Sequence, residues 1–96
     1  SGYVKHVYKQ SAGIELPHNA KQISERGQTV STEELKPGDL VFFNTMRRAF
    51  SHVGIYAGDD KFVHAASTRS GAVTVSDMKD KYWSKRFDGA RRIEVK

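Results

Sequence analysis

Hydrophobic and polar positions change their spacing about a third of the way along the chain. In residues 2–11, apolar side chains recur at helical intervals, and Gly13 follows as a stop signal. A second helix is predicted over residues 19–26, with Asn19 as its N-cap and Gly27 at its end. The spacing therefore predicts two short helices in the N-terminal part of the chain.

The rest of the chain carries the pattern of short strands. The Pro37-Gly38 turn introduces a compact β-prone run, and further β-prone runs follow it. The predicted strands are residues 39–43, 51–58, 61–67, 72–75 and 91–95. A loop is expected over residues 45–50, and a helix over residues 78–86 with Asp77 near its start. Helices followed by consecutive short strands predict an α+β domain in which N-terminal helices pack on an antiparallel sheet.

Length and composition narrow the class of protein. Ninety-six residues suffice for one hydrophobic core, so we expect a single domain over residues 1–96. The longest apolar run, residues 40–43, is far shorter than the ~20 residues of a membrane-spanning helix. The formal net charge of +5 favours anionic partners. A nucleic-acid partner is not predicted, because aromatic residues do not alternate with Lys and Arg on a strand face.

Two alternating strands around a Gly-Asp-Asp turn form the most informative segment. A three-residue loop over residues 58–60 would pair Gly54 with His64 and Ile55 with Val63. A two-residue loop would instead pair Ile55 with His64 and set an apolar face beside a polar one. Burial favours the three-residue loop, which directs four side chains into one core: Val53, Ile55, Val63 and Ala65.

In that register His52 and His64 lie on one face as diagonal neighbours, about 7–8 Å apart at the backbone. Their rings can then hydrogen-bond, as a general base does with the residue that orients it. Gly54 between them would leave room for a substrate or another helix to approach. Tyr56 shares this face and is expected to be a packed aromatic. The alternative is a pair of half-buried histidines with local polar partners.

Other chemistry is poorly supported by the residue types present. The chain contains no cysteine, which excludes disulfides, cysteine-ligated zinc and a cysteine nucleophile within these 96 residues. No metal site or cofactor is predicted, because only two histidines converge and Asp59 and Asp60 lie at the far turn. His6 and His18 are expected to face solvent.

Four motifs resemble the NlpC family of cell-wall cysteine endopeptidases, and most closely its Gram-negative murein endopeptidases of the NlpC and Spr type. They are Ser1-Gly2-Tyr3-Val4, Leu35-x-Pro37-Gly38-Asp39-Leu40-Val41-Phe42-Phe43, His52-Val53-Gly54-Ile55-Tyr56 and Phe62-Val63-His64-Ala65. The resemblance continues through Tyr82-Trp83 and Ala90-Arg91-Arg92-Ile93 and so covers all 96 residues. It implies a papain-like α+β fold.

The resemblance also implies roles for individual residues. The family's nucleophile is the cysteine of an Asp-Cys-Ser-Gly-Phe/Tyr-Val motif at a helix start, and this sequence begins at the Ser-Gly of that motif. A cysteine is thus expected immediately before Ser1, in a domain that here lacks its N-terminal portion. His52 corresponds to the general base and His64 to the residue that orients it. Ser1 and Ser51 are candidate substrate contacts, or else a helix-start and a strand-edge residue.

The implied activity is hydrolysis of amide bonds in D-amino-acid-containing peptidoglycan peptides, in the periplasm or cell envelope, by a lipoprotein or a secreted effector. Three explanations account for the absent cysteine. It is a modified or uncounted residue of a longer protein, the chain is a catalytically silent cell-wall-binding module, or Ser1 is an N-terminal nucleophile. The last is disfavoured because the side chain of Ser1 leaves the helix start about 100° from the required direction. An N-terminal segment or partner chain is expected to cover the first helix.

Overall fold

The computed structural model describes residues 2–65 and 72–93. Its helices are α1 (Gly2–Ala12), α2 (Ala20–Ile23), the 3-10 helix η1 (Thr32–Glu34) and α3 (Lys81–Ser84). Its strands are β1 (Gln28–Val30), β2 (Leu40–Phe43), β3 (His52–Gly58), β4 (Lys61–Ala65), β5 (Val73–Asp77) and β6 (Phe87–Arg92). No helix within these two ranges is long and apolar enough to cross a membrane.

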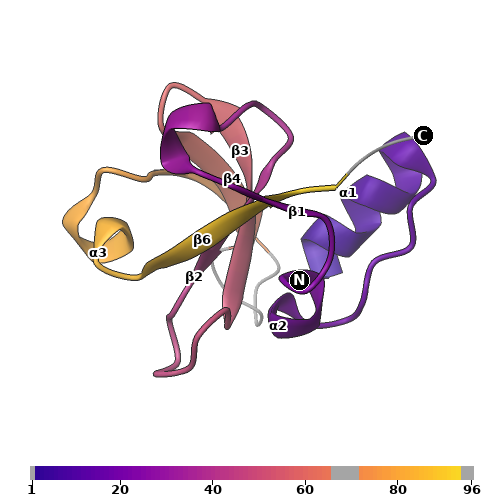
Figure 1. Ribbon diagram of the computed structural model, residues 1–96, viewed down its shortest axis with the longest axis horizontal. Coiled ribbons are helices and arrows are strands. Elements are labelled where there is room, and N and C mark those ends of the chain that lie inside the picture. The colour runs from indigo at the N-terminus through magenta and orange to yellow at the C-terminus, as the bar shows by residue number, and fades with distance from the viewer. Residues whose placement is uncertain (1, 66–71, 94–96) are drawn as a thin grey trace.

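All the described strands join one antiparallel sheet in the order β1-β6-β2-β3-β4-β5. Strands β2 to β5 form the predicted meander, and β6 returns to lie between β1 and β2. Figure 1 shows α1 and α2 on one side of the sheet and α3 on the other. The predicted α+β class with an antiparallel sheet is therefore confirmed.

The helices differ from their predicted bounds mainly in length. Helix α2 is a single turn, and Asn19 caps it as predicted, since its Oδ1 accepts a hydrogen bond from the backbone N of Gln22 at 2.8 Å. Helix α3 is also a single turn, and Asp80 is its N-cap. Asp77 is not near a helix start, because it forms the last residue of β5.

The predicted strands differ from the observed strands mainly at the two ends of the sheet. Strand β6 begins at Phe87 rather than at residue 91, and β5 extends to Asp77 rather than ending at residue 75. Strand β1 and helix η1 were not predicted, because Val30 is the only buried residue in either. The predicted strand ends at residues 66–67 and 94–95 lie outside the described residues.

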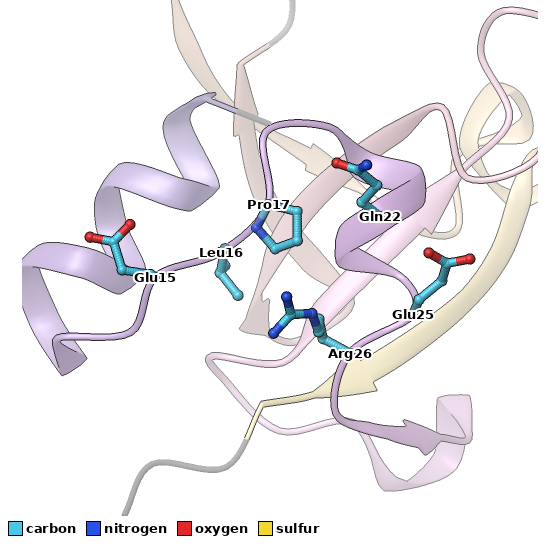
Figure 2. Close-up of a pocket in the computed structure, with 6 residues that line it drawn as sticks. All are labelled: Glu15, Leu16, Pro17, Gln22, Glu25 and Arg26. Carbon is cyan, nitrogen blue, oxygen red and sulfur yellow. The ribbon is translucent and has the colours of Figure 1, made fainter.

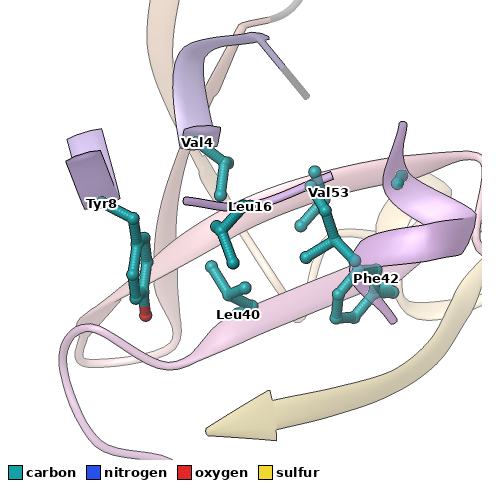
Figure 3. Close-up of a cluster of buried hydrophobic side chains, with 8 residues drawn as sticks. Val4, Tyr8, Leu16, Leu40, Phe42 and Val53 are labelled. Atoms are coloured by element: carbon teal, nitrogen blue, oxygen red, sulfur yellow. The ribbon is translucent and has the colours of Figure 1, made fainter. Parts of the chain in front are cut away.

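The sheet buries side chains on both faces, and β2 shows why. Its four residues are fully buried, with Leu40 and Phe42 facing the N-terminal helices and Val41 and Phe43 facing the other side. The cluster under the helices (Figure 3) consists of Val4, Tyr8, Leu16, Ala20, Ile23, Leu40, Phe42 and Val53. The cluster on the opposite face consists of Val30, Val41, Phe43, Tyr56, Phe62 and Ala90, with Trp83 of α3 packed against it.

This second cluster corrects the predicted core of the hairpin. Val53 is buried and Ile55 packs against the first cluster, as predicted, but Val63 and Ala65 are only half-buried. The deeply buried residues of β4 are Phe62 and His64, on the face assumed to be more polar. That face is buried because Trp83 covers it. Tyr56 is a packed aromatic, as predicted.

The β3–β4 register is as predicted, although the turn is not. Ile55 pairs with Val63, but the turn contains two residues, Asp59 and Asp60, whose φ angles are 51° and 62°. Positive φ at both central residues is the requirement of a type I′ hairpin. A bulge before Gly58 adds one residue to β3 and so restores the alignment of the two faces. The prediction of a three-residue loop is therefore wrong, whereas the predicted register of β3 against β4 is confirmed.

Gly54 is needed for the packing of β4 against β3. A Cβ on this residue would lie 2.7 Å from Cδ2 of Phe62, 3.0 Å from the carbonyl oxygen of Val63 and 3.2 Å from Cβ of His64. The space beside Gly54 is thus filled by the neighbouring strand. The expectation that it is open to a substrate or another helix is wrong.

An ion pair between a buried carboxylate and a partly exposed guanidinium ties the start of β2 to the end of β6. Nε and Nη2 of Arg92 donate to Oδ1 and Oδ2 of Asp39 at 2.9 and 2.8 Å, and the backbone N of Lys36 donates to Oδ2 at 2.9 Å. Burial raises the pKa of Asp39, but these donors outweigh it and hold the pKa below its ordinary value. Because Asp39 is only 4% exposed, its carboxylate depends on these partners.

We expect Gly54→Ala to lower the free energy of unfolding by about 1–3 kcal/mol, since two of the three close contacts are to a backbone oxygen and a Cβ, which cannot move aside freely. Urea denaturation measures the change. Gly2→Ala is the control, because a Cβ there meets nothing within 4 Å. Equal stability of the two variants would contradict this account of Gly54.

Candidate active site

The two strand histidines meet through a direct hydrogen bond. His52 is the first residue of β3 and pairs with Phe43 at the end of β2, while His64 lies in β4. Nε2 of His52 lies 2.8 Å from Nδ1 of His64. The rings are nearly perpendicular, with an interplanar angle of 88° and centroids 5.0 Å apart. The hydrogen bond expected from the hairpin register is therefore present.

A third side chain continues this contact into β5. The other ring nitrogen of His64, Nε2, lies 2.8 Å from Oγ of Ser76. His52, His64 and Ser76 thus form a hydrogen-bonded row across three neighbouring strands. Sequence reasoning missed Ser76 because the predicted strand ended at residue 75. The missing information was the pairing of β4 with β5, which sets Ser76 opposite Phe62.

Aromatic rings cover this row. Trp83 of α3 stacks on His52 at 5.5 Å between centroids and meets His64 edge-on at 5.0 Å. The ring of Phe62 lies 4.6 Å from that of His64. As a result His64 is only 1% exposed, and His52 is half-buried. The sequence identifies Trp83 only through the family resemblance, because a one-turn helix has too little periodicity to show which face it buries.

Burial sets the charge state of both rings. It lowers the pKa of His52 to about 4, with a smaller contribution from His64 nearby, and it lowers the pKa of His64 as well. Both imidazoles are therefore neutral at pH 7, so in their shared contact one nitrogen donates and the other accepts. Nδ1 of His52 makes no hydrogen bond with any described residue, which leaves this nitrogen for a proton-transfer partner.

Helix α1 packs against the two strands that carry the histidines. It contacts both β3 and β4, and its described part begins at Gly2. The first backbone N–H groups of a helix have no partner within the helix and carry its positive dipole end. This end of α1 is therefore suited to stabilise negative charge.

The remaining candidate residues are placed as follows. Ser1 lies outside the described residues. Oγ of Ser51 accepts hydrogen bonds from the backbone N of Thr45 at 2.9 Å and of Met46 at 3.3 Å, so this side chain holds the loop between β2 and β3. His6 and His18 are exposed, as expected. Within residues 2–65 and 72–93, no three His, Asp or Glu side chains are grouped to hold a metal ion.

Two surface hollows differ in their relation to the histidines. Figure 2 shows one between the α1–α2 connection and the residues in and after α2. Its lining is Glu15, Leu16, Pro17, Gln22, Glu25 and Arg26, with no residue of β3 or β4. The other hollow is lined in part by Asn44, which follows Phe43, the residue paired with His52 in the sheet. It carries three cationic side chains and one carboxylate, and its lining is Asn44, Thr45, Arg47, Lys85, Arg86 and Asp88.

The sequence of the chain is similar to that of known proteins. The model of the NlpC/P60 family matches residues 1–92. The chain is 43% identical over 93 residues to the murein DD-endopeptidase MepS/murein LD-carboxypeptidase of Escherichia coli K12, covering 97% of this chain and 48% of that protein. It is 42% identical over 95 residues to the gamma-DL-glutamyl hydrolase of Bacillus subtilis, covering 98% and 22%. The chain thus spans about half or less of these relatives.

Solved structures agree with the fold. An NlpC/P60 family protein from Bacillus cereus superimposes with a TM-score of 0.84 at 29% identity, over 95% of this chain and 30% of that one. A lipoprotein-like NLP/P60 family protein from Staphylococcus aureus gives 0.83 at 34% identity, over 97% and 31%. The expected papain-like α+β fold and the family resemblance are confirmed.

We expect the free energy of unfolding to fall as the pH is lowered from about 6.5 to about 4. The pKa of His52 is about 4 in the folded protein against an ordinary value of 6.5, so folding excludes a proton that the unfolded chain binds. The stabilisation is fully present above pH 6.5 and is lost as the pH falls through the folded pKa. For one partly exposed group of this kind it amounts to roughly 1–3 kcal/mol, because solvent screens part of the effect.

Urea denaturation at pH 7.5 and pH 4 measures this loss. Replacing His52 with Gln should weaken the pH dependence and leave the part that His64 contributes. Replacing the exposed His6 with Gln should leave the pH dependence as it was. An unaltered pH dependence in the His52 variant would contradict the assignment.

Proposed function

The chain belongs to the NlpC/P60 family, and we propose that it is the peptidase domain of a peptidoglycan hydrolase whose nucleophile is a cysteine immediately before Ser1. In this proposal His52 is the general base and His64 the residue that orients it. The observation that carries it is the 2.8 Å bond from Nε2 of His52 to Nδ1 of His64, which holds the base by one nitrogen and leaves Nδ1 for the nucleophile.

The reaction begins with transfer of the cysteine thiol proton to Nδ1 of His52. Burial keeps this imidazole neutral beforehand, so its nitrogen has a lone pair to receive the proton. The thiolate that forms at the start of α1 is stabilised by unpaired N–H groups and the helix dipole. The opposite charges of thiolate and imidazolium favour each other, which raises the pKa of His52 above its value in the isolated pair.

The thiolate then attacks the carbonyl carbon of a substrate amide. The oxyanion of the tetrahedral intermediate accepts hydrogen bonds from backbone N–H groups at the same helix start. Collapse of the intermediate breaks the C–N bond, and the amine leaves with the proton from His52. Water attacks the resulting thioester, giving a proton to His52, and the cysteine is released when this proton returns to its sulfur. The indole of Trp83 packs against the rings of His52 and His64 and limits their contact with solvent.

The proposed substrates are the short D-amino-acid-containing peptides of peptidoglycan. Two relatives of the chain, a murein endopeptidase and a gamma-DL-glutamyl hydrolase, support this class. The hollow beside the β-partner of His52 also supports it, because Arg47, Lys85 and Arg86 give it a surplus of positive charge suited to peptide carboxylates. Ser1 and Ser51 remain proposed substrate contacts. The proposed location is the periplasm or cell envelope, where the protein would be a lipoprotein or a secreted effector. We propose neither a cofactor nor a nucleic-acid partner.

The second candidate is a catalytically silent cell-wall-binding module of the same fold. It is favoured by one observation, that the 96 residues contain no cysteine. Mass spectrometry of the full-length protein after thiol alkylation separates the two. We expect a labelled or modified cysteine directly before Ser1, together with cleavage of purified wall peptides. Binding of those peptides without a thiol at that position and without cleavage would establish the silent module instead.

Single replacements separate the roles of the two histidines. In the full-length protein, His52→Ala should lower kcat at least 100-fold, since no other described group takes its place as base. His64→Ala should cost less, because an orienting residue does not transfer the proton. Release of cleaved wall peptides, followed by chromatography, measures both, and His6→Ala is the exposed-histidine control. A larger loss at His64 than at His52 would reverse the two roles.

A further inference from the structure

The two contacts of His64 restrict where protons can lie in the row of side chains. With both rings neutral, each has one N–H, and only two arrangements satisfy both 2.8 Å contacts. In the first, Nε2–H of His52 donates to Nδ1 of His64, and Nε2–H of His64 donates to Oγ of Ser76. In the second, all directions are reversed, and the hydroxyl of Ser76 donates to Nε2 of His64.

Only the first arrangement supports a base at His52. It leaves the lone pair on Nδ1 of His52, whereas the second places a hydrogen there and makes that nitrogen unable to accept a proton. Once His52 is protonated, both its nitrogens carry hydrogen, so its Nε2–H needs the lone pair on Nδ1 of His64. The hydrogen of neutral His64 must then lie on Nε2, facing Ser76. Both forms of the base therefore require Oγ of Ser76 as an acceptor.

Among the described residues, Ser76 alone offers an acceptor to Nε2 of His64. His64 is 1% exposed, and the rings of Phe62 and Trp83 pack against it without offering an acceptor. Among the described residues, His52 is the one titratable side chain in contact with it. A buried N–H without an acceptor is costly, so losing Oγ penalises the arrangement that the base needs.

The sheet register places Ser76 for this role. His64 pairs with Thr74, and Ser76 lies two residues further along β5 on the same face. His52 stands in the corresponding diagonal position on the other side, two residues from Gly54. The three polar side chains thus cross β3, β4 and β5 on a diagonal, each within reach of the next.

We propose that Ser76 is a positioning residue: by accepting a hydrogen bond from Nε2–H of His64, it holds the histidine pair in the tautomers that keep Nδ1 of His52 free to act as a base. This role rests on the proposed function of the pair. Ser76 touches neither the nucleophile nor the reacting bond in this scheme, and acts through His64.

Nitrogen-15 NMR of the imidazole rings tests the proposal directly, since protonated and unprotonated ring nitrogens resonate at distinct shifts. In the full-length protein with the proposed nucleophile replaced by Ala, we expect hydrogen on Nε2 and none on Nδ1 in both His52 and His64 at pH 7. Hydrogen on Nδ1 of both rings in this protein overturns the proposal without any change at Ser76.

Variants in the full-length, thiol-containing protein test the consequence for catalysis. Ser76→Ala should lower kcat about tenfold or more with little change in KM, and should move the acid limb of the pH profile to lower pH, because the imidazolium of His52 loses support. Ser76→Thr keeps the hydroxyl and should restore most of the rate. Thr74→Ala, which removes a hydroxyl from the same face of the same strand, is the matched control.

These readouts separate the inference from the proposed function. Unchanged tautomers and rate in Ser76→Ala would overturn the role of Ser76 while hydrolysis by the unaltered protein continued. If the unaltered protein shows the expected tautomers and Ser76→Ala loses them, the role of Ser76 is upheld even when the protein does not cleave wall peptides. A failure to cleave wall peptides would count against the proposed function alone. If Ser76→Ala does not fold, the NMR spectrum of the protein with Ser76 intact still decides the tautomer.

Discussion

The site depends on a single register, that of β3 against β4. Side chains alternate along a strand, so a slip of one residue would turn either His52 or His64 to the opposite face and separate them. The turn between the strands has two residues, and on its own it would produce that slip. The bulge before Gly58 compensates for it. Asp59 and Asp60 contribute because short acidic side chains tolerate the positive φ that such a turn requires. A distortion at one end of the hairpin thus brings the two imidazoles together at the other.

Burial on both faces of the sheet explains why the two histidines are neutral. The helices α1 and α2 cover one face, and Trp83 covers the face that carries the imidazoles. Burial of polar rings is tolerated only when their nitrogens are hydrogen-bonded. The row from His52 to Ser76 meets that requirement, and in the described part of the chain no buried side-chain nitrogen or oxygen lacks a partner. The polar row therefore forms part of the core as well as the site.

The fold class, the β3–β4 register and the histidine pair could be predicted because each depends on spacing within a short segment. The features that could not be predicted depend on two local changes that offset each other, or on packing between segments far apart in the sequence. A two-residue turn with a bulge and a three-residue loop give the same register, so alternation does not separate them. The burial of Phe62 depends on Trp83, which lies in a helix too short to show an amphipathic pattern. Ser76 becomes a partner of His64 only through the pairing of β4 with β5.

The position of Trp83 also affects the fluorescence of the protein. It is the single tryptophan in these 96 residues, and its indole stacks on the imidazole of His52 at 5.5 Å. A charged imidazolium quenches indole emission at such contact, whereas a neutral imidazole quenches it far less. The fluorescence intensity of this domain should therefore report the protonation of His52 without any label. Proton transfer during a turnover would become visible in real time as a transient loss of light.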